Sequence, residues 1–98
     1  MENNKINAAI QLLPGGEKDF AYHIVDKAIG VIEKSGLKYR VCPFETVVEG
    51  PLQEIMELIR AIRDESFQAG AEDILINLKL QLGKDKDILI HDKMNKYE

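Results

Sequence analysis

The segment from Gly36 to Gly50 constrains the fold more than any other part of the chain, because it combines a helix stop, two short strands and a turn. Gly36 follows a helical pattern and suits a left-handed C-terminal cap. Apolar and polar side chains alternate over the next six residues, which is typical of a half-buried strand. Pro43 ends this strand because it cannot donate a ladder hydrogen bond. The β-branched residues at 46–48 favour a second strand, so the segment predicts a hairpin.

One strand and one helix are predicted on each side of this hairpin. Residues 5–13 alternate as a strand, and an apolar stripe predicts a helix over 18–35. Pro51 occupies a first-turn position of a second helix that is expected to end at Gln68, and a clean alternation predicts a last strand over 73–82. This order predicts an α+β protein of the ferredoxin-like βαββαβ type, a sandwich with an antiparallel four-stranded sheet and two helices on one face.

The chain of 98 residues is long enough for one hydrophobic core. We therefore expect a single ferredoxin-like domain over 1–98, with a short C-terminal extension over 83–98. Within the extension, 88–90 are expected to form a short strand or turn, and 91–97 a helical turn or two. The residues that we expect together in the core are Ile10, Ile24, Ile59, Ile76 and Leu78.

The helices can cover only one face of such a sheet. Alternation along the first and last strands places a polar but weakly charged set of side chains on the other face. That set consists of Asn7, Ala9, Gln11, Leu75, Asn77, Lys79 and Gln81. A face of this kind packs against another subunit, binds a ligand or is simply solvated. Because two edge strands also attract pairing, we expect self-association as a dimer or tetramer.

Composition and charge narrow the possible partners. The net charge of −4 makes nucleic acid and anionic membrane surfaces poor partners. Cys42 is the only cysteine, so an intrachain disulfide is impossible. No apolar run approaches the ~20 residues of a membrane span, and the first residues lack the hydrophobic region of a signal peptide. A cytoplasmic protein is the simplest interpretation.

The sequence offers little support for catalysis. Cys42 has no candidate histidine base in the adjacent sequence, so a structural thiol is the better interpretation. Glu45 and Glu49 could form a pair of carboxylates, but no acid–base partner in a contrasting environment is evident. The single cysteine also excludes the C-x-x-C loop of metal-transport domains. We therefore predict a protein that is not an enzyme and that has neither a metal site nor a resident cofactor.

The hairpin segment also resembles the thiamine-binding (YkoF-like) family of small proteins. The shared pattern is G-x-K-Y at 36–39, Pro43 and T-x-x-E-G at 46–50. The position of this pattern between two strand–helix units makes the match fairly specific. The resemblance continues more weakly over nearly the whole chain, including Ile88 to Tyr97.

This resemblance implies a small-ligand-binding protein for thiamine or its hydroxymethylpyrimidine moiety. Thr46 and Glu49 match the family motif, and Tyr39 matches its strand. We add Gln11, Phe44 and Asn77 from their positions, since an aminopyrimidine needs polar partners and an aromatic or apolar slot.

Two alternatives remain open. Thr46 and Glu49 serve equally well as a strand former and a turn acid before a helix. The whole chain could also be an oligomeric scaffold or regulatory module with no small ligand.

Overall fold

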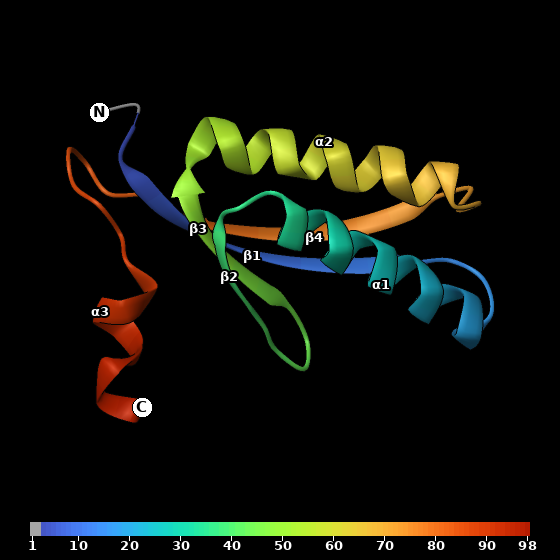
Figure 1. Cartoon of the computed structure of the whole chain (residues 1–98), viewed down its shortest axis with the longest axis horizontal. Coiled ribbons are helices and arrows are strands. Elements are labelled where there is room, and N and C mark those ends of the chain that lie inside the picture. Colours follow the sequence, from blue (N-terminus) through green and yellow to red (C-terminus); the bar gives the residue numbers. More distant parts are fainter. Residues whose placement is uncertain (1–2) are drawn as a thin grey trace.

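The computed structural model describes residues 3–98, and its sheet and two long helices follow the predicted order (Figure 1). The strands are β1 (Lys5–Pro14), β2 (Lys38–Val41), β3 (Thr46–Pro51) and β4 (Ile74–Gln81). The helices are α1 (Lys18–Lys34), α2 (Leu52–Gln68) and α3 (Ile90–Met94), followed by a 3-10 turn, η1 (Asn95–Tyr97). The sheet is antiparallel throughout, in the order β2-β3-β1-β4. The architecture is α+β, but it has three α-helices where two were expected.

The hairpin forms as predicted. Gly36 adopts a left-handed φ of +77° directly after α1, a conformation that costs glycine nothing because it has no Cβ. The backbone N–H of Cys42 donates to the carbonyl of Glu45 at 3.0 Å and closes the connection between β2 and β3. Val41 and Thr46 are the last paired residues on either side of it.

Both long helices lie on one face of the sheet. Ile10 of β1 pairs with Thr46 and Leu78, and directly paired residues of an antiparallel sheet share a face. On that face the buried positions of α1 and α2 meet the strands. The cluster that they form contains Ile6, Ala8, Ile10, Ala28, Ile32, Val48, Ile55, Leu58 and Ile62.

The expected core residues are all at least partly buried. Ile10 belongs to the cluster and Ile24 is fully buried. Ile59, Ile76 and Leu78 are partly buried and pack against the cluster. This confirms the predicted phase of the alternations in β1 and β4, in which these side chains face the helices.

The chain after β4 turns back toward the start of β1. A bridge between Gly83 and Lys86 forms the turn, and the N–H of Ile88 then donates to the carbonyl of Lys5 at 2.9 Å. Residues 88–89 form neither a strand nor a turn and Ile90 already belongs to α3, so the expectation for 88–90 was wrong and the turn lies before them, at 83–86. The chain then enters α3, which stands apart from α1 and α2 at one end of the sheet (Figure 1).

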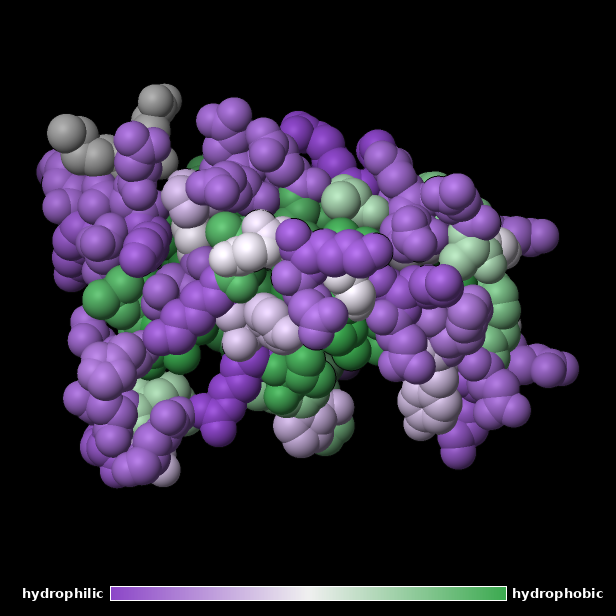
Figure 2. Space-filling view, in the orientation of Figure 1, coloured by the Kyte–Doolittle hydropathy of each residue, from purple (hydrophilic) through white to green (hydrophobic). Residues whose placement is uncertain are grey.

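Hydrophilic side chains cover most of the surface in the view of Figure 2, with hydrophobic patches between them. Within residues 3–98, none of the helices combines the length and the apolar character that a bilayer crossing requires.

Candidate functional site

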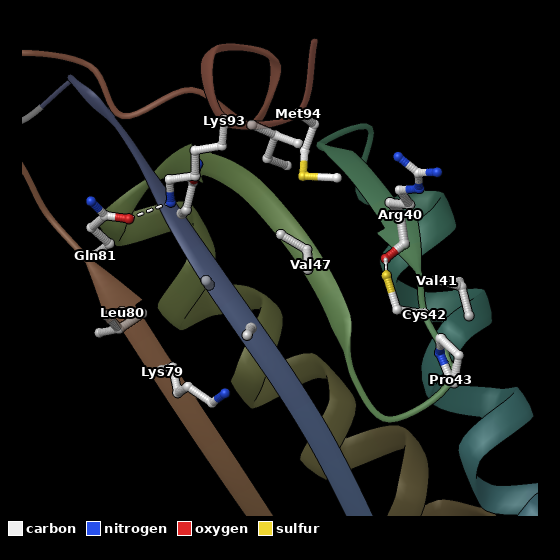
Figure 3. A pocket seen from close by; sticks show the side chains of 14 residues that line it. Arg40, Val41, Cys42, Pro43, Val47, Lys79, Leu80, Gln81, Lys93 and Met94 are labelled. Atoms are coloured by element: carbon white, nitrogen blue, oxygen red, sulfur yellow. Dashed lines mark hydrogen bonds between the residues drawn. The ribbon is translucent and has the colours of Figure 1, made fainter. Parts of the chain in front are cut away.

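A pocket of about 680 Å³ lies on the sheet face that α1 and α2 leave uncovered (Figure 3). Its volume falls within the range of roughly 300–1,000 Å³ that is usual for small-molecule sites. The sheet forms the floor, the end of β2 and the residues after it form one wall, and α3 contributes Lys93 and Met94 to another. Three parts of the chain that are distant in sequence therefore build this pocket.

One row of paired residues runs across all four strands and forms the floor. Consecutive members of the row pair in register, so their side chains lie on the same face. The row is Arg40, Val47, Ala9 and Lys79, from β2 to β4. Small apolar side chains occupy its centre and basic side chains its two ends, so the floor is flat in the middle and positively charged at the edges.

The neighbouring row attaches α3 to the sheet. Glu49 and Asn7 pair with each other in this row, and both are more than nine-tenths buried. The carboxylate Oε1 of Glu49 accepts a hydrogen bond from the backbone N–H of Ile90 at 2.6 Å. The side-chain amide of Asn7 donates to the carbonyl of Ile88 at 2.8 Å. These two bonds fix the start of α3, and with it one wall of the pocket.

The Oδ1 atom of Asn7 is a buried acceptor for which the described residues supply no partner. Asn7 also lines the pocket. A buried polar atom of this kind calls for an explanation, because the great majority of such atoms in folded proteins are hydrogen-bonded.

The charged side chains at the pocket are basic. Arg40, Lys79 and Lys93 line it, while none of the described residues that line it is acidic. Arg40 forms an ion pair with Glu98, and Lys79 lies 3.4 Å from Glu45. Lys93 donates to the neutral side-chain oxygen of Gln81. Carboxylates therefore balance part of this charge from outside the pocket.

Among residues 3–98, His, Cys, Asp and Glu side chains nowhere gather in a group of three that could hold an ion.

Thr46 and Glu49, which the sequence pattern placed in one candidate site, lie on opposite faces of the sheet. They are three positions apart in β3, and side chains alternate between faces along a strand. Thr46 pairs with the core residue Ile10 and is buried on the helix side. Glu49 pairs with Asn7 on the opposite face.

Tyr39 lies on the same side as Thr46. It pairs with the core residue Val48, and its hydroxyl donates to Oε2 of Glu33 in α1 at 3.4 Å. Tyr39 therefore joins the hairpin to the helix layer, and its ring is not aimed at the pocket on the other face.

Gln11 and Asn77 lie on the uncovered face, one row beyond the floor. They pair in register, and Nδ2 of Asn77 donates to Oε1 of Gln11 at 3.0 Å. They are outside the pocket lining. Phe44 is in the connection between β2 and β3, where it is 82% exposed.

The T-x-x-E-G motif serves both faces of β3. A Cβ atom on Gly50 would lie 2.9 Å from Cδ2 of Leu37, so a larger residue there would require the end of the Leu37 side chain to shift. Thr46 packs on the helix side and Glu49 holds α3 on the other. The motif therefore marks the strand that joins the two layers.

Several residues that line the pocket were absent from the sequence prediction of the site, namely Asn7, Arg40, Val47, Lys93 and Met94. Alternation already placed Asn7 and Lys79 on the uncovered face. No local pattern indicated that the C-terminal segment would return to cover that face.

Comparison with known proteins gives consistent matches along the chain. A family described as thiamine-binding protein matches residues 8–98. A UPF0045 protein of Clostridium perfringens is 31% identical over 91 residues, which span 93% of this chain and 95% of that protein. A Thermotoga maritima structure, reported as a candidate thiamine biosynthesis/salvage protein, has a TM-score of 0.88 at 31% sequence identity. The match covers 96% of this chain and 99% of the Thermotoga chain. A Bacillus cereus domain of unknown function has a TM-score of 0.91 at 27% identity and covers 98% and 92%, respectively.

Proposed function

Because this chain belongs to the thiamine-binding protein family, we propose that its pocket on the uncovered sheet face binds thiamine or the hydroxymethylpyrimidine moiety of thiamine. The observation that carries this proposal is the pocket itself, whose volume of about 680 Å³ suits a ligand of this size. Its floor has Ala9 and Val47 at the centre, where a flat ring can lie against small apolar side chains.

Asn7 supplies the proposed polar contact for the pyrimidine. The exocyclic amino group of an aminopyrimidine is a hydrogen-bond donor, and Oδ1 of Asn7 is a buried acceptor without a partner among the described residues. Leaving a buried acceptor unpaired costs about 1–3 kcal/mol. A ligand that reaches this atom, after a small displacement of the side chains around it, would recover part of that energy.

The residues selected from the sequence take different roles in this proposal. Glu49 acts through α3, since its bond to Ile90 positions the wall that carries Met94. Gln11, Asn77 and Phe44 remain proposed contacts for the part of a longer ligand that extends past Lys79. Thr46 and Tyr39 are proposed to support the hairpin from the helix side and not to contact the ligand.

We also interpret the strand order β2-β3-β1-β4, with one long helix in each crossover, as the ferredoxin-like arrangement that the family resemblance implies. On the sequence grounds given above, we propose that the protein acts in the cytoplasm.

Stabilisation by ligand tests the proposed function. Thiamine and hydroxymethylpyrimidine should each raise the melting temperature, because a ligand at ~100 times its dissociation constant adds about 2.7 kcal/mol to the free energy of unfolding. Ala9→Leu fills the centre of the floor and should abolish the shift. Ala61→Leu makes the same change at an exposed position of α2 and should preserve it.

Absence of a shift with either ligand in the wild-type protein would favour the alternative of an oligomeric scaffold or regulatory module. One observation supports that alternative independently. Leu13 and Leu75 pair on the uncovered face and are 43% and 58% exposed, so they form an apolar contact area away from the pocket.

A further inference from the structure

The charge of the pocket does not suit a ligand whose only charge is positive. Arg40, Lys79 and Lys93 line the pocket, and at short range like charges repel. The thiazolium ring of thiamine would meet this basic lining, whereas the bare pyrimidine, being neutral, would gain nothing from it. A ligand that carries negative charge would make use of it.

The basic groups are concentrated at the β4 side of the pocket. Lys79 and Gln81 are two positions apart on β4 and so share a face, about 6.6 Å apart along the strand. Lys93 of α3 donates to the Gln81 side chain. Two ammonium groups from different elements therefore flank the same short stretch of β4 (Figure 3). Arg40 lies across the pocket on β2 (Figure 3).

Neither ammonium group is strongly engaged within the chain. Lys79 is 3.4 Å from Glu45, and its side chain is 77% exposed. Exposed ion pairs of this kind contribute little to stability, because water screens them. Lys93 has the uncharged Gln81 side chain as its partner. An anion could therefore recruit both lysines without breaking a buried contact.

From this geometry we propose that the ligand is a phosphomonoester of the aminopyrimidine, with its phosphate held between Lys79 and Lys93. The inference rests on the proposed function, since it names the ligand class of the same pocket. A phosphomonoester carries a charge of about −1.5 to −2 at pH 7 and offers strong acceptor oxygens. Lysine suits it as a mobile point charge with several donors. The ring would then lie over Ala9 and Val47, toward Asn7.

The test compares affinities within two matched pairs of ligands by calorimetry. The pairs are hydroxymethylpyrimidine with its phosphate and thiamine with thiamine monophosphate, with inorganic phosphate measured alone. We expect the phosphate to tighten binding by about ten- to a hundredfold in each pair, the range given by one or two charge-assisted hydrogen bonds. That ratio should shrink as salt is raised, because added ions screen exposed charges.

Charge-neutralising variants locate the phosphate. Lys79→Gln and Lys93→Gln should each weaken the phosphorylated ligand more than its unphosphorylated partner, so that the ratio of these two affinities moves toward one. Arg40→Gln should lower the ratio less, since Arg40 lies across the pocket. Lys27→Gln removes the same charge from an exposed position of α1 and should leave the ratio unchanged.

The outcomes separate this inference from the function on which it rests. Equal affinity for both members of each pair would overturn the phosphate inference and leave the proposed function intact. No binding of any pyrimidine ligand would overturn both. Inorganic phosphate binding as tightly as the pyrimidine phosphate would support the anion subsite and contradict recognition of the ring. A ratio that falls equally in all four variants would overturn the assignment to Lys79 and Lys93.

Discussion

Glu49 has the most consequential single contact at the pocket, because its buried carboxylate joins β3 to the first residue of α3. Hydrogen bonds to charged groups contribute about 1.5–3 kcal/mol. Glu49→Ala should therefore destabilise the protein by about that amount and expose the N–H of Ile90 to exchange. Glu49→Gln keeps an acceptor oxygen and should cost less.

Hydrogen exchange at Ile90 measures this effect directly, with denaturant unfolding as the global readout. Glu57→Ala, at an exposed position of α2, is the matched control and should change neither. If Glu49→Ala left the protection of Ile90 as it is in the wild-type protein, Glu49 would not be the anchor of α3.

Thr46 and Val47 are adjacent in β3 and point to opposite faces, so a reciprocal exchange of their chemistry tests which face binds the ligand. Thr46→Val removes a hydroxyl from the helix side and should leave ligand affinity unchanged. Val47→Thr places a hydroxyl in the apolar floor and should weaken binding by about 0.5–2 kcal/mol, the cost of desolvating a polar group. Calorimetry with hydroxymethylpyrimidine distinguishes the two faces. A loss of affinity with Thr46→Val alone would place the site on the helix side.

At the scale of elements, Asp87 attaches the segment that leads into α3 to the start of β1. The side-chain amide of Asn4 and the backbone N–H of Lys5 both donate to Oδ1 of Asp87, at 3.0 and 2.8 Å. These hydrogen bonds, the one from Asn4 first, lower the pKa of Asp87 below its usual value of 3.8. Because they favour the ionised carboxylate, the attachment is complete above pH 3.8 and is lost as the pH falls through the lowered pKa of the folded state.

This pH dependence is measurable at the amide of Ile88, which follows Asp87 and donates to Lys5. Its NMR chemical shift should titrate with an apparent pKa below 3.8, and Asp87→Asn should remove that titration. Asp26→Asn, on the exposed side of α1, should have no effect. A midpoint at or above 3.8 would show that the two hydrogen bonds do not stabilise the carboxylate.

The elements differ in how much of them the sequence could predict. The hairpin, both long helices and the strand phases follow from local periodicity, and they are confirmed. Met56 fits the apolar periodicity of α2 but is 37% exposed. The helix instead meets the sheet along Ile55, Leu58 and Ile62, at spacings of three and four residues, and Met56 lies at the border of that stripe.

The pocket was harder to predict because its walls meet only in the folded chain. Asn4 and Asp87 are 83 positions apart in sequence, and no local pattern indicates such a contact. The separation of Thr46 and Glu49 could have been predicted from the sequence, since residues three positions apart in a strand face opposite sides. Their chemical types suggested a shared site, whereas the alternation of β3 places their side chains on opposite faces.

At the scale of the whole molecule, the uncovered sheet face extends beyond the pocket to Leu13 and Leu75. These two leucines pair in register and are exposed, and β2 and β4 are both edge strands that attract pairing. We therefore predict that the protein self-associates as a dimer or tetramer, and that burial of this apolar area contributes to the association.

Light scattering at micromolar concentration tests this prediction. Leu75→Lys should lower the measured mass, because it places a charge in the proposed contact. Tyr22→Lys, at a position of α1 that is 59% exposed against 58% for Leu75, should leave the mass unchanged. A monomer mass for the wild-type protein would show that it does not self-associate at this concentration.

The central claim is that the ligand binds the sheet face opposite the long helices, and methyl NMR tests it most directly. Two adjacent pairs supply internal controls. Ala9 and Val47 line the pocket, whereas Val48 is fully buried in the core and Ala8, although it also borders the pocket, is only 1% exposed and belongs to the core cluster. Titration with hydroxymethylpyrimidine phosphate, and in parallel with thiamine, should shift the methyl signals of Ala9 and Val47 and leave those of Ala8 and Val48 in place. Larger shifts at Ala8 and Val48, or no shift at any of the four, would contradict the claim.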